Sequence, residues 1–192
     1  DPAVRMVGET RALATAELTF KGALSGHGVW TTLHANSAPA IITRLRDMGI
    51  QPYMLADHEL VKGLISQRLF RKLCPHCRVS VKERLNDPAV KRLKIALGDF
   101  GIENTYVRGP GCKFCDNKGI KGRMSVPEII LPDAVFLELM IAGETRKAID
   151  YWTSDLNGRP LKDAAIERML KGYIDLDEVE RWCGLLDQRP AY

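Results

Sequence analysis

The stretch Cys74-Pro-His-Cys77 decides how the second half of this chain must fold, because it has a matching partner in Cys112-Lys-Phe-Cys115. Each Cys-x-x-Cys pair can present two thiolates to one metal ion, and two pairs complete the tetrahedral site that Zn²⁺ prefers. Residues 78–111, between the pairs, exceed the usual ribbon spacing and must carry structure of their own. The pattern predicts structural zinc on four ligands: Cys74, Cys77, Cys112 and Cys115.

Two redox-active dithiols and disulfide bonds are the alternatives to zinc. A thioredoxin-like dithiol needs a strand before it and a helix after it, and neither pair has that setting clearly. His76, inside the first pair, could replace one cysteine as a ligand, although four thiolates already suffice. The fifth cysteine, Cys183, lies at helical spacing from apolar neighbours, which favours a buried apolar cysteine over a reactive thiol.

Composition excludes some classes of protein. The formal net charge of +4 falls by about 2 when four thiolates bind one Zn²⁺, which is too mild to indicate nucleic-acid binding. No apolar run approaches the roughly 20 residues of a membrane span, and no signal peptide is visible. Metal-type cysteine usage, with one cysteine left over, favours a reducing compartment and therefore a cytoplasmic protein.

The first part of the chain alternates strand and helix patterns. Residues 4–7 and 29–33 read as strands, and residues 10–25 and 38–48 as helices. This order predicts an α/β fold with parallel strands, in which ligands gather at the carboxyl ends of the strands. Glu9 and His34 both fall at such ends and could therefore face one site.

The rest of the chain reads as mainly helical. We expect helix over most of residues 52–73, a helix over 88–97 that Asp87 caps, a loop over 119–123 and a strand over 125–131. Asp175-Leu-Asp-Glu178 resembles a capping box. Further helices are expected at residues 133–142, 144–152, 161–171 and 175–186.

A series of motifs then becomes specific. Gly8-Glu-Thr-Arg11 follows an apolar strand, Ser25-Gly-His27 comes next, and Thr31-Thr-Leu-His-Ala-Asn36 follows the second strand. With Leu73-Cys-Pro-His-Cys77 downstream, the series resembles the type II secretion and type IV pilus-assembly ATPases over nearly the whole chain. It is more similar to the extension or secretion branch, because retraction motors usually lack the four cysteines.

The resemblance implies roles for single residues. Gly8 and Glu9 match the Walker B element, in which a carboxylate orients the attacking water and helps to hold Mg²⁺. His34 matches the histidine box, which faces the nucleotide phosphates. Arg11 and His27 would support the site. Thr10 and Ala12 flank Arg11 here, so the carboxylate that the family more often has after the arginine is missing.

The phosphate-binding loop is missing from this sequence. That loop needs a Gly-Lys dipeptide, and none occurs here; in the family it lies upstream of the Walker B strand. Together with the abrupt start at Asp1-Pro2, this indicates a piece cut from a larger fold. ATP and Mg²⁺ would then be cofactors of the full-length parent, and the piece alone is expected not to hydrolyse ATP.

The expected architecture is a partial RecA-like ATPase core over residues 1–73, a tetracysteine zinc module over 74–131 and a helical region over 132–192. The resemblance implies a homo-hexamer that sits peripherally at the inner membrane and drives assembly-platform proteins there. The alternative function is a zinc-binding docking module, or a nucleic-acid-binding module, without ATPase activity.

A basic cluster lies around the first cysteine pair. It is either a solvated face or a docking surface for an acidic partner or for anionic lipid. Nucleic acid is a weaker option, because almost no aromatic residues lie among the charges. The members are Arg68, Arg71, Lys72, Arg78, Lys82, Arg84, Lys91, Arg92 and Lys94.

Overall fold

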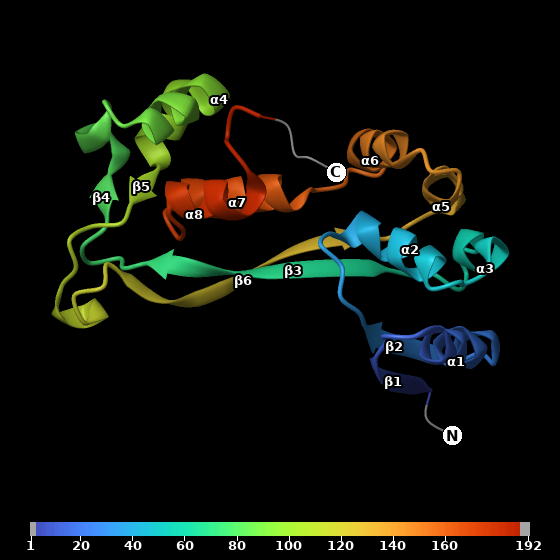
Figure 1. The fold of residues 1–192 in the computed structure, drawn as a ribbon. Coiled ribbons are helices and arrows are strands. Elements are labelled where there is room, and N and C mark those ends of the chain that lie inside the picture. The colour runs from blue at the N-terminus through green and yellow to red at the C-terminus, as the bar shows by residue number, and fades with distance from the viewer. Residues whose placement is uncertain (1–2, 189–192) are drawn as a thin grey trace. The chain divides into compact units, whose positions relative to one another are not determined.

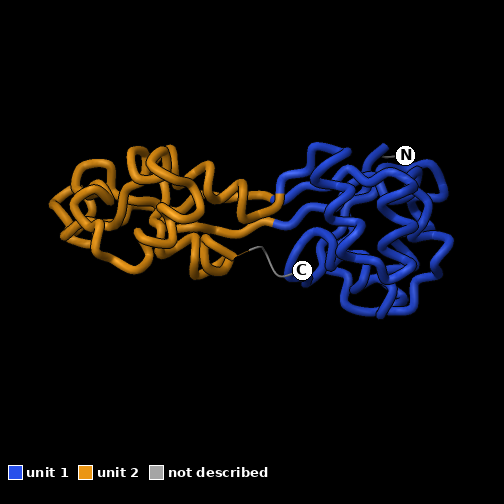
Figure 2. The backbone as a smooth tube through the Cα atoms, turned by 90° about the horizontal axis from the view of Figure 1, so that it is seen from above, with its two compact units in different colours: residues 1–66, 128–159 blue, residues 67–127, 160–192 orange. Residues whose placement is uncertain are grey.

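The computed structural model describes residues 3–188, and the expected cut at Asp1-Pro2 lies outside them. The chain forms two compact units (Figure 2). Unit 1 combines Asp1–Ser66 with Glu128–Arg159, and unit 2 combines Gln67–Pro127 with Pro160–Tyr192. Each unit is therefore built from two separate segments of sequence. The division by motif at residues 73 and 131 stays a prediction.

Unit 1 begins with the expected strand–helix–strand order. Strand β1 (Val4–Glu9), helix α1 (Leu13–Leu24) and strand β2 (Gly28–Thr32) follow one another (Figure 1). The two strands pair in parallel, with Val4 opposite Gly28 and Glu9 opposite Thr32. The α/β order and the parallel pairing are confirmed for these strands, which form a two-stranded sheet.

Four more helices complete unit 1: α2 (Ala38–Asp47), α3 (Pro52–Ala56), α5 (Ala134–Ile141) and α6 (Thr145–Ser154). Ser37 and Asp133 cap α2 and α5 through their side chains, as local sequence favours. The helices share one apolar core whose fully buried side chains include Ile42, Leu55, Phe136, Leu137 and Trp152.

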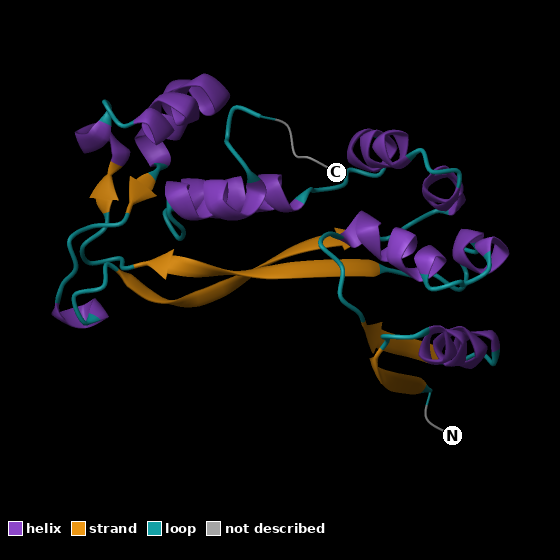
Figure 3. Cartoon of the chain, in the orientation of Figure 1, coloured by secondary structure: helices purple, strands orange, loops and turns teal. Residues whose placement is uncertain are grey.

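The prediction of helix over residues 52–73 is wrong for most of that range. Only α3 is helical, and Leu64–Leu73 forms strand β3, which pairs with β6 (Ile120–Ile130). Leu64 and Phe70 are buried, whereas Ile65 and Leu69 are exposed, so burial follows the two faces of a strand. Strand β6 is also longer than the expected 125–131 and includes part of the expected loop at 119–123. The long strands stand out in Figure 3.

Unit 2 contains the second part of β3, the first part of β6, two short strands and three α-helices. Strands β4 (Val79–Ser80) and β5 (Tyr106–Val107) pair antiparallel. Helix α4 (Pro88–Asn104) starts at the cap Asp87 and kinks at Gly98, whose φ is 61°. Helices α7 (Leu161–Leu170) and α8 (Leu176–Cys183) follow the expected positions. The core of unit 2 contains Phe70, Leu93, Val126, Met169 and Ile174.

The end of β3 is joined to the turn between α7 and α8. The N–H of Leu73 donates to the carbonyl of Tyr173 at 2.8 Å, and Lys72 forms an isolated antiparallel bridge with Ile174. Cys74 follows directly, so this junction fixes where the first cysteine pair begins. Across the described residues, no helix combines the length and apolar character that a membrane crossing requires.

Candidate functional site

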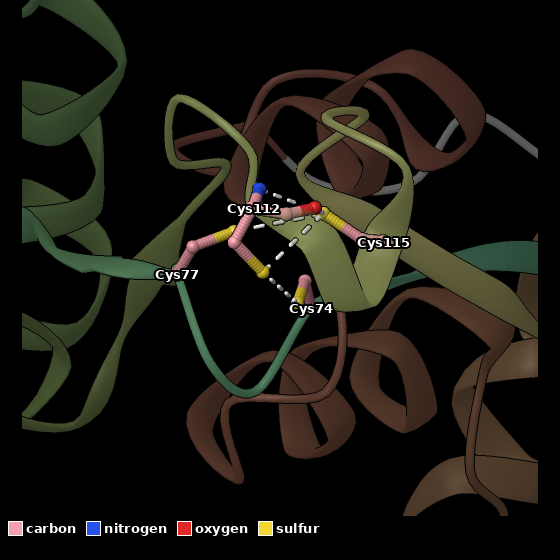
Figure 4. Close-up of side chains that lie close together, drawn as sticks. All are labelled: Cys74, Cys77, Cys112 and Cys115. Atoms are coloured by element: carbon pink, nitrogen blue, oxygen red, sulfur yellow. Dashed lines mark hydrogen bonds between the residues drawn. The ribbon is translucent and has the colours of Figure 1, made fainter.

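The four paired cysteines converge on one point in unit 2 (Figure 4). Their Sγ atoms all lie within 4.8 Å of one another. The distance is 3.7 Å between Cys74 and Cys112, 3.8 Å between Cys77 and Cys115, and 3.8 Å between Cys112 and Cys115. A Zn–S bond of about 2.3 Å gives a tetrahedron with edges of about 3.8 Å. The spacing therefore fits one tetrahedral zinc ion and is far longer than a disulfide bond of about 2.05 Å.

Backbone donors surround the thiolate of Cys115. The N–H groups of Cys112 and Gly119 donate to its Sγ at 3.3 and 3.1 Å. Burial raises the pKa of the Cys115 thiol, but these hydrogen bonds to the thiolate outweigh burial and lower the pKa to about 6. Such donors favour the deprotonated sulfur that a metal ion needs.

Close backbone packing brings the two cysteine pairs together. The N–H of Cys74 donates to the carbonyl of Gly119 at 3.0 Å. A Cβ on Gly109 would lie 1.6 Å from the carbonyl oxygen of Cys77, and Gly111 combines a φ of 103° with a similar clash against Asn117. Gly109 is therefore required by the approach of the second pair to the first, and Gly111 by the tight turn of the second pair's own loop.

His76 is not part of the thiolate cluster, which consists of the four cysteines. Its exposed ring packs on Phe114 of the second pair, with 4.4 Å between the ring centroids. This contact links the outer surfaces of the two cysteine loops. The structure thus gives His76 a packing role and leaves the four-thiolate set as the candidate metal site.

In unit 1, Glu9 and His34 meet at the carboxyl ends of β1 and β2. Nε2 of His34 lies 2.7 Å from Oε1 of Glu9. The Glu9 side chain is 28% exposed and that of His34 is 88% exposed. The arrangement places a carboxylate and an imidazole together at the sheet edge where α/β proteins bind ligands.

Arg11 pairs with a carboxylate, although neither of its sequence neighbours, Thr10 and Ala12, provides one. Its Nη2 donates to Oε2 of Glu9 at 2.5 Å. This hydrogen bond, opposed by desolvation, lowers the pKa of Glu9, and the charges of Arg11 and His34 add to the effect. The partner of Arg11 is therefore Glu9, two residues earlier.

Two threonines, which had no assigned role in the sequence, hold the ends of β1 and β2 together. The hydroxyl groups of the buried Thr10 and the half-buried Thr31 lie 2.7 Å apart, and Oγ1 of Thr31 lies within donating distance, 2.8 Å, of the carbonyl of Gly8. The N–H of Thr10 also donates to the carbonyl of Thr32 at 2.7 Å. These side chains fix the strand that presents Glu9 against the strand that leads to His34.

His27 lies near the opposite end of the strand pair. Its Nδ1 is 2.8 Å from the hydroxyl of Ser25, and its Nε2 is 3.0 Å from Nη2 of Arg5. Arg5 sits near the start of β1, whereas Glu9 ends that strand. The structure therefore brings Glu9, Arg11 and His34 together and holds His27 against the first half of β1.

Several members of the basic cluster have partners within unit 2. Arg71 binds Glu178, and Arg92 binds Glu180 through two nitrogen atoms. Arg78 donates to the carbonyl of Gly172 at 2.6 Å and stacks on the ring of Tyr106. These contacts explain much of the cluster as internal structure and leave less of it for an external partner.

The sequence matches a family model described as "Type II/IV secretion system protein" over residues 1–181. The type II secretion system protein E of Aeromonas hydrophila is 36% identical over 94% of this chain and 34% of that protein. The type IV pilus assembly ATPase PilB of Thermus thermophilus is 34% identical over 93% of this chain and 20% of that protein. The chain thus spans about a third or less of these relatives.

Solved structures agree at the level of the fold. The pilus retraction motor PilT, crystallised with bound ADP, gives a TM-score of 0.62 at 20% identity and covers 95% of this chain and 40% of that chain. The ATPase DotB of Yersinia pseudotuberculosis gives 0.57 at 19% identity and covers 96% of this chain and 37% of that chain. By the family match over most of its length, the chain belongs to the type II/IV secretion system protein family.

Proposed function

We propose that this chain is the C-terminal part of a longer cytoplasmic ATPase that powers type IV pilus assembly or type II protein secretion. Family membership supports this proposal, as do the two relatives, a type II secretion system protein E in Aeromonas and a type IV pilus assembly ATPase in Thermus. The four cysteines favour the extension or secretion branch over retraction motors. Because the chain spans only part of those relatives, ATP hydrolysis is assigned to the full-length protein.

The observation that carries the proposal is the 2.7 Å contact between Glu9 and His34 at the carboxyl ends of parallel strands. In the full-length protein, the Glu9 carboxylate would orient the attacking water and contribute to holding Mg²⁺. The His34 imidazole would hydrogen-bond the terminal phosphate. Arg11 would keep Glu9 ionised, and Gly8 would let the strand end approach the nucleotide.

Zinc in this proposal is structural. Four thiolates fill a tetrahedral coordination shell, so no position is left for a water molecule or a substrate. The ion would join β3, which leads into the first pair, to the short 3₁₀ turn Lys113–Cys115 and the start of β6. Its chemistry would be to cross-link these segments.

We further propose that ATP hydrolysis requires subunits and sequence beyond this chain. No Gly-Lys dipeptide is present to hold the phosphates, so the chain alone would not hydrolyse ATP. The full-length protein would act as a homo-hexamer, with a partial RecA-like core in this chain, at the inner face of the inner membrane. Its partners there would be assembly-platform proteins.

ATPase assays of the full-length protein test the proposal. Glu9→Gln is expected to lower kcat at least about 100-fold while ATP binding persists, because the amide cannot act as the carboxylate does. Glu17→Gln, on the exposed face of α1, is the matched control and should keep wild-type activity. A wild-type protein without ATPase activity would favour a zinc-binding docking module instead. Full activity in Glu9→Gln would refute the role proposed for Glu9.

A further inference from the structure

Glu128 is a buried carboxylate whose partner lies far away in the sequence. The residue stands on β6 and is 1% exposed. Its Oε2 accepts a hydrogen bond of 2.6 Å from the backbone N–H of Ala38, ninety residues earlier. A buried carboxylate is retained only with such donors, so this contact is a fixed part of unit 1.

Ala38 is the first residue of helix α2. The Ser37 side chain accepts from the N–H of Ala40 at 3.4 Å, and Pro39 has no N–H to satisfy. Both N–H groups in the first three positions of the helix therefore end on side-chain oxygens, one from Ser37 and one from Glu128. The positive end of the helix dipole adds to the attraction for the carboxylate.

This helix start is one end of the segment that carries His34. Residues 33–37 connect Thr32, the last residue of β2, to Ala38. At the strand end, the carbonyl of Thr32 accepts from the N–H of Thr10. At the helix end, the N–H of Ala38 donates to Glu128.

The His34 ring itself is 88% exposed, so packing of the ring does not determine where it lies. Its 2.7 Å distance to Glu9 therefore depends on how residues 33–37 are held, both at the two ends and through Leu33, which packs against the core of unit 1. The helix end is held by a hydrogen bond to a residue from the second segment of unit 1.

We propose that Glu128 is a positioning residue for His34. By fixing the N–H of Ala38, it sets where α2 begins and thus where the imidazole stands relative to the Glu9 carboxylate. The catalytic consequence rests on the proposed ATPase function, whereas the positional claim does not. The two are therefore tested by separate measurements.

The positional test is the nuclear Overhauser contact between the His34 ring protons and the Glu9 methylene protons in this chain. Glu128→Ala is expected to lose the contact, whereas Glu128→Gln should keep it because an amide oxygen can still accept from Ala38. Asp133→Ala is the matched control: it removes a carboxylate that caps α5 in the same unit, where Oδ1 accepts from Phe136 at 2.9 Å. This control should keep the contact.

Glu128→Asp covers the case in which Glu128→Ala does not fold, because the shortened side chain stays charged but withdraws from Ala38. A folded Glu128→Asp or Glu128→Ala protein with the full wild-type contact would overturn the proposal. Loss of the contact in a folded Glu128→Gln, or equal loss in Asp133→Ala, would overturn it as well.

The catalytic test uses the full-length protein. Glu128→Ala is expected to lower kcat by about 10- to 100-fold, the scale of a small misplacement of a catalytic group, with a much smaller change in KM for ATP. Glu128→Gln should restore most of the loss, and Asp133→Ala should stay near wild type. An inactive wild-type protein would refute the proposed ATPase function and leave the proton contact to decide the role of Glu128.

Discussion

Arg71 on β3 and Glu178 on α8 form an ion pair in which both carboxylate oxygens of Glu178 accept hydrogen bonds. Nε and Nη2 of Arg71 donate to Oε2 of Glu178 at 3.0 and 2.6 Å, and the backbone N–H of Arg71 donates to Oε1 at 3.2 Å. The indole N–H of Trp182 adds a fourth donor at 3.4 Å. Cys74 comes three residues after Arg71, directly after the end of β3. The ion pair therefore holds the end of β3, which leads into the thiolate cluster, against α8.

Replacing Glu178 by alanine should therefore destabilise unit 2. The Glu178 side chain is 4% exposed, but Arg71 is 42% exposed and can regain water. We expect a loss of about 2 kcal/mol in the free energy of unfolding, below the roughly 3–5 kcal/mol of a fully buried pair. Urea denaturation of wild type and Glu178→Ala measures this loss. Glu144→Ala, which removes an exposed partner of Lys147, should cost under about 0.5 kcal/mol. Equal losses in the two variants would contradict this role.

The same pair should make stability depend on pH. Burial raises the pKa of Glu178, but the hydrogen bonds and charge of Arg71 prevail, and its folded pKa lies below the ordinary 4.5. A depressed folded pKa gives stability that is fully present above pH 4.5 and is lost as pH falls through the folded pKa. The stability difference between wild type and Glu178→Gln should shrink over that acidic range, as measured by urea denaturation at several pH values. A difference that stays constant down to pH 3 would rule out this linkage.

Zinc should be lost when one of its ligands is removed. We expect wild-type protein to carry one zinc ion per chain and Cys112→Ser to carry almost none, because three thiolates leave the shell incomplete. In this variant the rate of amide hydrogen exchange should rise around residues 74–77 and 112–119, and the melting temperature of unit 2 should fall. Cys183→Ser is the control, since Cys183 lies outside the thiolate cluster. Full zinc content and an unchanged melting temperature in Cys112→Ser would refute the four-thiolate site.

Local signals predicted much of this fold. The predicted cap Asp87 accepts a backbone N–H at the start of its helix, because capping acts over only a few residues. The cysteine spacing likewise predicted which sulfurs would converge. Strand β3 was missed because its apolar residues also fit a helical period. What selects the strand is pairing with β6, whose residues come much later in the chain.

Partners that are distant in sequence explain the other misses. The motif Asp175-Leu-Asp-Glu178 resembles a capping box, and Asp175 does cap α8. The carboxylate of Glu178, however, is taken by Arg71, more than a hundred residues earlier. The basic residues around the first cysteine pair can be read from the sequence. Their pairing with Glu178 and Glu180 cannot, because these partners lie far away along the chain. Glu128 was missed for the same reason, because its donor is a backbone N–H that no motif marks.

The Arg11–Glu9 hydrogen bond leads to a prediction about the pH dependence of the ATP hydrolysis that we propose for the full-length protein. Arg11 lowers the pKa of Glu9, so the carboxylate stays ionised at lower pH than usual. In Arg11→Gln the pKa of Glu9 should rise toward its ordinary value. The acid limb of the pH profile of kcat/KM should then move to higher pH, because a protonated Glu9 cannot orient water as a base. Arg146→Gln removes an equal charge from the exposed pair with Asp150 in the same unit and should leave the limb in place. An acid limb that does not move in Arg11→Gln would show that Glu9 is not the group whose ionisation limits the reaction.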